Sequence, residues 1–193
     1  SGDAGVNTAQ LGARNGQAHR RGAAGHKQRV VCEALAVGQR DSPGFGIDPD
    51  RGHLARARPR ARAAEVPAVL VAASAEELPF ADASVDAVVS TWCLCSIPDV
   101  ARALGEVRRV LRPGAPFLFV EHGLCPAPGV AAWQRRLAPL WRRIAGGCNL
   151  DRPVAELIGR AGLVIERLET GHLMPGPRLL AWTYQGLARA PLT

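Results

Sequence analysis

Three consecutive segments decide the fold class: SVDAVVST at residues 84–91, VARALGEVRRVL at 100–111 and PFLFV at 116–120. The first and third are short apolar runs of strand length. The second has apolar residues at helical spacing and stops at Arg112-Pro113-Gly114. A strand, a helix and a strand at this spacing predict two parallel strands joined by a crossover helix.

The same alternation continues on both sides of this unit. Toward the amino end we expect strands at 45–47 and 66–72, a helix at 53–64, and either a strand or a short helix at 29–37. Toward the carboxyl end we expect helices at 130–144 and 153–161 and strands at 163–168 and 179–185. The last two strands have no helix between them, so as neighbours they pair antiparallel. The sequence thus predicts an α/β fold with a mostly parallel sheet and an antiparallel strand near the carboxyl terminus.

The length and composition fit one globular domain. With 193 residues, of which 47% are hydrophobic, the chain is long enough for one α/β domain and too short for two with good cores. Residues 1–28 show no hydrophobic period, so we expect a tail there and a single domain at 29–193. No apolar run reaches the roughly 18 residues of a membrane-spanning helix, and we see no secretory signal. We therefore expect a cytoplasmic protein.

The basic charge is a weak guide to partners. The net charge is +7, but all 24 basic residues except Lys27 are arginine. Together with the abundant alanine, glycine and proline, this is typical of a GC-rich genome. The arginine run at 51–62 has no aromatic residues interleaved for base stacking. We expect a small-molecule substrate, no nucleic acid and no obligate protein partner.

The cysteines are scattered at positions 32, 93, 95, 125 and 148. Without an export signal, reduced thiols are the expected state. The pair Cys93 and Cys95 has no second CxxC and no HxxxH partner. We therefore expect no metal site and interpret these thiols as small buried hydrophobic groups.

Four motifs carry a resemblance to a known family: GIDPD at 46–50, AEELPF at 75–80, SVDAVVS at 84–90 and EVRRVLRPG at 106–114. In this order and spacing they resemble the class I S-adenosylmethionine-dependent methyltransferases. The resemblance covers about residues 44–185, and it implies a Rossmann-like, doubly wound fold and S-adenosylmethionine as the cofactor. Further motifs look like the small-molecule branch that includes the membrane-associated thiol methyltransferases: LCSIP at 94–98, EH at 121–122 and GCNL at 147–150.

The resemblance implies a ribose-binding role for Asp48, with Pro49 beside it in the same motif. A carboxylate has two acceptor oxygens for the two ribose hydroxyls, and ligands bind at the carboxyl ends of parallel strands. The alternative is that Asp48 is a helix cap or forms an Asx turn before Arg51.

The turn at Ser74, Ala75 and Glu76 follows the next predicted strand. There the family holds the adenine edge with a side chain and an adjacent backbone amide. Ser74 stands where the family often has aspartate, so its contact with the exocyclic amine would be weaker. Glu76 equally fits a surface carboxylate in the first turn of a helix. Thr91 ends the strand that, by the resemblance, faces the transferred methyl group.

Candidate residues for the acceptor side follow the next strands. Cys93 and Cys95 fit either substrate contact or core packing. His122 directly follows PFLFV, where an imidazole could take a proton from the incoming nucleophile, or could be structural. Glu121 could orient His122, meet the sulfonium charge, or simply end the strand.

One feature of the family is missing. Its methionine-binding loop is acidic-x-Gly-x-Gly-x-Gly, because backbone amides must approach the ligand without a Cβ in the way. The chain has no such run, and the interval from Gly38 to Asp48 is too short for a loop, a helix and a strand. We interpret residues 1–43 as a non-native amino-terminal region, through a frame error or a misassigned start; the alternative is a truncated, inactive homologue.

The segment Val130–Ile144 is expected to cover the acceptor pocket. Trp133, Leu137 and Trp141 lie at helical spacing and are predicted to turn inward over the strand ends that carry Cys93 and His122, with arginines opposite. The alternative for this segment is a peripheral contact with an anionic membrane surface.

The expected function is methyl transfer from S-adenosylmethionine to a small, apolar acceptor with a thiol, amine or hydroxyl group. No metal is needed, since the sulfonium is already activated and the protein supplies alignment and desolvation. The alternative is a non-catalytic remnant or interaction module that keeps the sheet but does not bind the cofactor.

Overall fold

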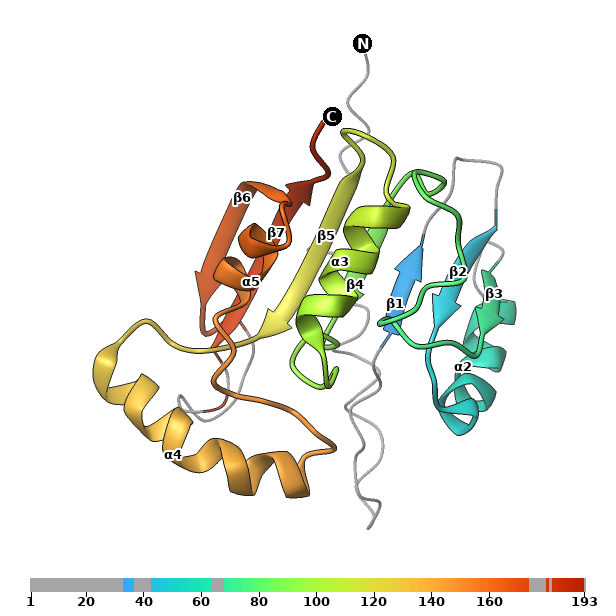
Figure 1. Cartoon of the computed structure of the whole chain (residues 1–193). Coiled ribbons are helices and arrows are strands. Elements are labelled where there is room, and N and C mark those ends of the chain that lie inside the picture. The colour runs from blue at the N-terminus through green and yellow to red at the C-terminus, as the bar shows by residue number, and fades with distance from the viewer. Residues whose placement is uncertain (1–32, 37–42, 64–67, 174–179, 181, 193) are drawn as a thin grey trace.

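A computed structural model describes residues 33–36, 43–63, 68–173, 180 and 182–192, and Figure 1 shows the arrangement of the elements. Among these residues, seven strands form one sheet of order β3-β2-β1-β4-β5-β7-β6. The strands are β1 Glu33–Ala36, β2 Gly44–Ile47, β3 Ala68–Val71, β4 Val88–Thr91, β5 Pro116–His122, β6 Val164–Gly171 and β7 Thr183–Arg189. The described helices are α2 Arg51–Ala63, α3 Val100–Val110, α4 Pro128–Ile144 and α5 Val154–Arg160. The expected tail at 1–28 lies outside the described residues.

The direction of the strands confirms the predicted α/β sheet. β2 pairs with β3 in parallel, and β4 pairs with β5 in parallel. β7 runs antiparallel to both of its neighbours, β5 and β6. The expected bounds 179–185 for this last strand are wrong, because pairing continues through Leu187 and Ala188, both buried, to Arg189.

β1 is reversed relative to its neighbours. It pairs antiparallel with both β2 and β4, with Glu33 opposite Thr91 and Ala36 opposite Val88. The chain therefore enters β1 at the edge where β4 ends and leaves it at the opposite edge. A segment that follows β1 starts away from the edge where β2 and β4 end.

The core lies between the sheet and helices α3 and α5, which cover one face (Figure 1). Strand alternation sends Phe117 and Phe119 of β5 to the same face, where both are buried with Leu104 and Ile158. α4 lies beyond the carboxyl end of β5 (Figure 1). It is therefore placed at an end of the strands rather than over a face of the sheet.

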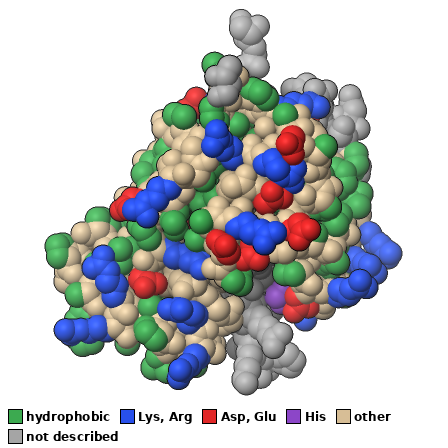
Figure 2. Space-filling model, viewed as in Figure 1, with side chains coloured by type: hydrophobic (Ala, Val, Ile, Leu, Met, Phe, Trp, Pro, Cys, Tyr) green, Lys and Arg blue, Asp and Glu red, His purple; other side chains and the backbone are tan. Residues whose placement is uncertain are grey.

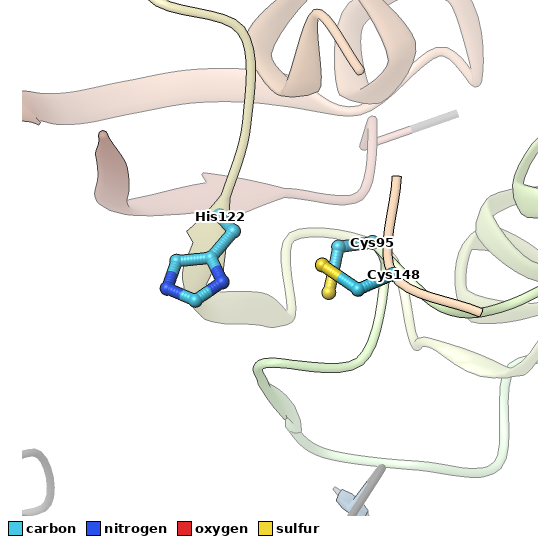
Figure 3. A group of neighbouring side chains, drawn as sticks. All are labelled: Cys95, His122 and Cys148. Atoms are coloured by element: carbon cyan, nitrogen blue, oxygen red, sulfur yellow. The ribbon is translucent and has the colours of Figure 1, made fainter. Parts of the chain in front are cut away.

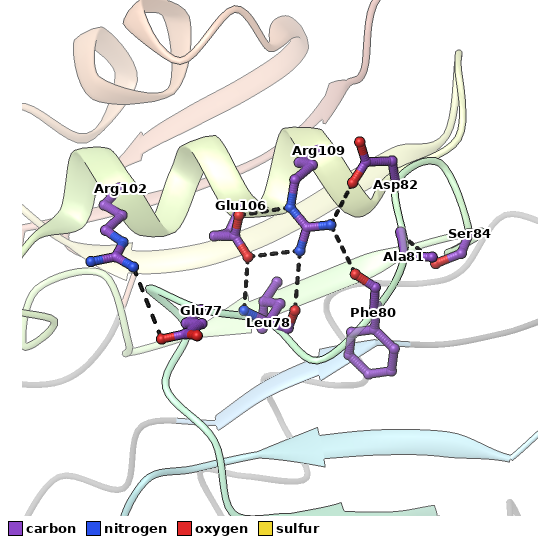
Figure 4. A network of polar contacts seen from close by, with 9 residues as sticks. All are labelled: Glu77, Leu78, Phe80, Ala81, Asp82, Ser84, Arg102, Glu106 and Arg109. Carbon is purple, nitrogen blue, oxygen red and sulfur yellow. Dashed lines mark hydrogen bonds and ion pairs between the residues drawn. The ribbon is translucent and has the colours of Figure 1, made fainter.

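A polar network fixes the loop before β4 to α3 (Figure 4). Glu106 accepts hydrogen bonds from the Leu78 backbone N–H at 2.8 Å and from Arg109 Nε at 2.7 Å. Arg109 also donates to the Phe80 carbonyl at 2.8 Å and to Asp82 at 2.6 Å. Arg109 lowers the pKa of the Glu106 carboxyl below its usual value. The network anchors the loop that follows the predicted adenine-binding turn.

The described helices include none with both the length and the apolar character needed to cross a bilayer.

Candidate active site at the carboxyl edge of the sheet

Four strands end at the same edge of the sheet. β2, β3, β4 and β5 run in one direction, so their carboxyl ends meet there. The predicted site residues follow these ends: 48–49 after β2, 74–76 after β3, 91–95 at β4, and 121–122 at the end of β5. The fold therefore brings the separate sequence motifs to one edge, where open α/β sheets bind ligands.

Asp48 is buried at the end of β2 and organises the start of α2. Its Oδ1 accepts a hydrogen bond from the Asp50 backbone N–H at 2.7 Å, and its Oδ2 lies 3.1 Å from His53 Nδ1. Asp50, in turn, accepts from the Gly52 N–H at 2.7 Å and caps the helix. The bond from the Asp50 N–H to Asp48 is an Asx-turn contact, so the structural role that the sequence left open for Asp48 is present. Each carboxylate oxygen has a further lone pair, so ribose hydroxyls are compatible with these bonds.

The side chains of Ser74 and Glu76 support the loop after β3. Ser74 Oγ accepts from the Glu76 backbone N–H at 3.1 Å. Glu76 Oε1 accepts from the Asp99 N–H at 2.6 Å, and Asp99 caps α3 by accepting from the Arg102 N–H at 3.0 Å. The two side chains hold the turn in place around Ala75. Their roles in binding adenine stay predictions.

Glu121 is fully buried and serves the turn after β4. It accepts from Ser90 Oγ at 2.6 Å, from the Cys93 N–H at 3.1 Å and from the Leu94 N–H at 3.0 Å. Burial raises the pKa of Glu121 to about 7, against the opposing effect of these hydrogen bonds. Neighbouring strand residues alternate between faces, so the side chains of Glu121 and His122 point to opposite faces of the sheet. The contacts of Glu121 identify it as a positioning residue for the turn.

Trp92 turns the chain sharply after β4. Its φ of +56° lies in the left-handed region that side chains other than glycine rarely adopt. Its backbone N–H donates to the Val120 carbonyl at 2.9 Å, and its ring meets the His122 ring edge-on, with centroids 4.0 Å apart. This turn places Cys93 and Cys95 beside the end of β5. Both thiols are buried, at 2% and 0% exposure.

Cys148 joins the site from the segment after α4. It lies in the GCNL motif, which marked the resemblance without predicting a site role for this cysteine. Cys95, His122 and Cys148 each bring a potential ligand atom, and these atoms lie within 4.8 Å of one another (Figure 3). The neighbouring Cys148 thiol and burial raise the pKa of Cys95 well above its usual value. Cys148 lies far from Cys95 and His122 in the sequence, so spacing alone gives no signal for this contact.

α4 borders the site with a different face from the one expected. Its buried residues are Ala131, Gln134 and Ala138. Trp141, next on this stripe, packs against Cys95 and Cys148. Gln134 attaches α4 to the chain after β5: it accepts from the Cys125 N–H at 2.7 Å and donates to the Gly123 carbonyl at 3.2 Å.

The expectation that Trp133 turns inward is wrong, since 54% of it is exposed. Trp133 lies about a quarter turn or more from the buried stripe, and the Arg136 guanidinium lies 5.8 Å from the centre of its ring. Arginine side chains spread over the α4 region at the lower left of Figure 2. Of the two tryptophans, Trp141 is the one beside the site.

The chain is similar in sequence to known methyltransferases. A family model described as a methyltransferase domain matches residues 25–119. The human thiol S-methyltransferase TMT1A is 40% identical over 112 residues, which cover 54% of this chain and 42% of that protein. The ubiquinone/menaquinone biosynthesis C-methyltransferase UbiE of Bradyrhizobium diazoefficiens is 34% identical over 126 residues, which cover 60% of this chain and 50% of that protein. The chain thus spans about half the length of these curated relatives.

Solved structures share the fold. A SAM-dependent methyltransferase from Methanosarcina mazei has a TM-score of 0.61 and 21% identity, over 77% of this chain and 82% of that chain. The [4+2]-cyclase SpnF has a TM-score of 0.60 and 19% identity, over 77% of this chain and 66% of that chain. Because one neighbour is a cyclase, the fold by itself leaves the reaction open. Together, the domain match and the methyltransferase relatives support a class I S-adenosylmethionine-dependent methyltransferase.

Proposed function

We propose that this chain transfers the methyl group of S-adenosylmethionine to the thiol of a small apolar molecule. The observation that carries the proposal is the convergence of Asp48, Thr91 and His122 on one edge of the sheet, at the ends of β2, β4 and β5. The identity with thiol S-methyltransferases supports the choice of acceptor atom.

The described residues fit the nucleoside end of the cofactor. The Asp48 carboxylate keeps lone pairs for ribose hydroxyls, and the turn around Ala75 offers backbone groups at the neighbouring strand end. The methionine end depends on the glycine-rich loop. The absence of that loop stays a prediction, because the positions between Ala36 and Pro43 lie outside the described residues.

When bound, S-adenosylmethionine supplies a methyl group already activated by its positive sulfur. The protein then has to bind the acceptor, exclude water and accept one proton. A thiol needs little help, since a few per cent is thiolate at pH 7. We assign the His122 imidazole as the group that accepts the proton of the acceptor thiol; the proton then passes to water. Trp141 and the buried Cys95 give this place an apolar wall.

The reversed β1 favours a second candidate, a non-catalytic member of the family. β1 ends at Ala36 on the opposite edge of the sheet from the ends of β2 and β4, whereas a methionine-binding loop is needed at the edge where β2 and β4 end. Such a protein would keep the sheet and lack cofactor binding.

One assay tests the acceptor atom. The purified chain is incubated with methyl-labelled S-adenosylmethionine at millimolar concentration and with thiophenol, phenol or aniline, which share a ring and differ in the acceptor atom. We expect labelled thioether alone, reduced in Asp48→Asn and unchanged in the surface control Glu166→Gln. Label in the ether or the amine would contradict the thiol assignment. No label in any product, together with no cofactor binding by calorimetry, would establish the non-catalytic candidate.

A further inference from the structure

Three metal-ligating side chains from separate segments meet at the carboxyl edge. Cys95 follows β4, His122 ends β5 and Cys148 follows α4. One ligand atom of each lies within 4.8 Å of the other two (Figure 3). Cys95 and Cys148 are 0% and 3% exposed, and His122 is half-buried.

We propose that Cys95, His122 and Cys148 bind one Zn²⁺ ion. Two thiolates and an imidazole are typical zinc donors; Zn–S bonds of about 2.3 Å and Zn–N bonds of about 2.0 Å put tetrahedral ligand atoms about 3.5–3.8 Å apart. The ligand atoms lie within 4.8 Å of one another, so each pair has to approach by about 1 Å at most to reach the tetrahedral separation. Rotation of the side chains is enough for this movement. Binding releases one proton from each thiol to solvent, the imidazole binds in its neutral form, and no electron is transferred.

The backbone around the three ligands is already fixed. The Asn149 backbone N–H and side-chain amide both donate to the Cys95 carbonyl, at 2.7 and 2.8 Å. Arg152, just before α5, donates to the carbonyls of Leu94 and Ile97, so it holds the same loop. Gly147, directly before Cys148, has a φ of +93°, a conformation that glycine adopts at little cost. The ion therefore meets a prepared site, and binding orders few further groups.

The surroundings suit a pair of thiolates. Leu150 forms a buried apolar cluster with the two cysteines, and Trp141 and Ala145 pack against it. The Trp141 indole N–H is buried and has no hydrogen-bond partner among the described residues. A thiolate on Cys148 would accept this N–H, as outer-shell donors do in metal sites.

Three protein ligands leave one position of a tetrahedral ion open, as in catalytic zinc sites. His122 is half-buried, so the cluster is partly exposed on the side of this ligand. In a step that rests on the proposed function, the acceptor thiol binds there as a thiolate, because zinc deprotonates a coordinating thiol. The acceptor's proton then goes to water, and His122 acts as a ligand instead of a base.

Cobalt provides a direct test on the whole chain. The protein is stripped with a chelator, kept reduced with a phosphine and titrated with Co²⁺, which reports thiolate ligands by charge transfer and tetrahedral geometry by intense d–d bands. We expect one ion per chain with both signatures, displaced by Zn²⁺. Absence of the thiolate band, or octahedral weak bands alone, would overturn the proposal.

Alkylation maps the ligands without any substitution. Because both thiols are buried, iodoacetamide reaches them only as the chain opens locally. With Zn²⁺ bound, we expect Cys95 and Cys148 to be alkylated more slowly than in the chelator-treated chain, as read by peptide mass spectrometry over time. Cys125, also buried but outside the cluster, is the internal control and should react equally with and without Zn²⁺. Equal reactivity of Cys95 and Cys148 in the two states would contradict the site, whether or not a variant folds.

Variants then quantify each ligand. We expect Cys95→Ser, Cys148→Ser and His122→Ala each to weaken Zn²⁺ binding by more than about 100-fold, the upper end for losing an outer-shell partner. Cys125→Ser should bind as the parent does. Addition of 2-mercaptoethanol to the Co²⁺ form should shift its bands if the fourth position is open. None of these measurements contains S-adenosylmethionine. A failed cofactor titration would therefore end the proposed function and leave the metal site standing. A failed metal titration would end the metal site and leave the proposed function standing.

Discussion

Ser90 and Glu121 face each other across β4 and β5, with Ser90 Oγ donating to Glu121 Oε1 at 2.6 Å, and both residues are buried. The same carboxylate accepts the backbone N–H groups of Cys93 and Leu94. Three donors thus satisfy one buried carboxylate. The bonds tie the end of β5 to the turn that carries Cys95.

We expect Glu121→Gln to lower the free energy of unfolding by about 1–3 kcal/mol, the cost of leaving buried hydrogen-bonding groups without partners. In the parent, each backbone N–H of this turn donates to a carboxylate oxygen. In the variant, the glutamine amide N–H would face one of these N–H groups, and two donors cannot bond to each other. Urea denaturation followed by circular dichroism measures the change. The matched control is Glu166→Gln, since Glu166 pairs with Arg189 at the surface. Parent-like stability with lost methyl transfer would instead support the catalytic role predicted for Glu121.

The network in Figure 4 gives a pH-dependent stability. Because Arg109 lowers the pKa of Glu106 in the folded state, the carboxylate contributes stability above its unfolded pKa of about 4.3 and loses it as the pH falls through the lower folded value. We therefore expect Glu106→Gln to be less stable than the parent at pH 7, with the difference shrinking toward pH 3. Urea melts at several pH values measure this.

Glu77 offers the control for that series. It lies 4.0 Å from Arg102, and both side chains are mostly exposed, at 85% and 61%. Exposed pairs contribute little, so Glu77→Gln should melt as the parent does across the range. An equal effect of both substitutions would mean that general charge balance, rather than the Glu106–Arg109 contact, sets the dependence.

Much of the fold follows from local pattern. The alternation at 84–120 predicted β4, α3 and β5, because buried strands and an amphipathic helix are decided by neighbouring residues. The direction of β1 did not follow, because apolar content shows that a short segment is buried and leaves its partner and orientation to the rest of the sheet.

The candidate site was predictable only where a motif marked it. Asp48 and His122 stand directly after predicted strands, so their place at the carboxyl edge follows from a parallel sheet. The meeting of Cys148 with Cys95 depends on how α4 returns toward the sheet, which spacing does not encode. Trp133 was misplaced because apolar residues on α4 occupy two faces, and the buried face is the one with Ala131, Gln134 and Ala138.

Asp48 tests the nucleoside half of the site. We expect Asp48→Ala to weaken S-adenosylmethionine binding by about 1.5–3 kcal/mol, the range for losing hydrogen bonds to a charged group, with a smaller loss in Asp48→Asn. Isothermal calorimetry measures the affinity, and a thermal melt separates it from loss of the contact with His53. A change in affinity below about 0.3 kcal/mol would leave Asp48 as a structural residue only.

The sequence predicts that the glycine-rich loop is absent, and this prediction can be tested through the cofactor affinity. Without the backbone amides of such a loop at the methionine end, we expect a dissociation constant weaker than about 10 μM, which is about −7 kcal/mol. Calorimetric titration of the parent chain measures it. A tighter constant would show that residues between Gly38 and Gly46 take the place of the loop.

The two tryptophans of α4 separate a pocket wall from a surface side chain. Trp141 packs against Cys95 and Cys148, whereas Trp133 is 54% exposed. If α4 borders the acceptor pocket, Trp141→Ala should raise the KM for an aromatic thiol by about 10-fold or more, since burying an aromatic side chain is worth roughly 1.5–3 kcal/mol. Cofactor affinity should stay nearly unchanged, because the nucleoside residues lie after β2 and β3.

Trp133→Ala is the matched control, as it removes the same ring from the same helix. We expect its KM and cofactor affinity to equal those of the parent, with at most a small change in solubility or surface binding. A fall of both affinities in Trp141→Ala would indicate a folding defect, which a thermal melt would reveal. A raised KM in Trp133→Ala with no effect in Trp141→Ala would move the acceptor to the outer face of α4, and would overturn the assignment of the pocket to the side facing the two cysteines.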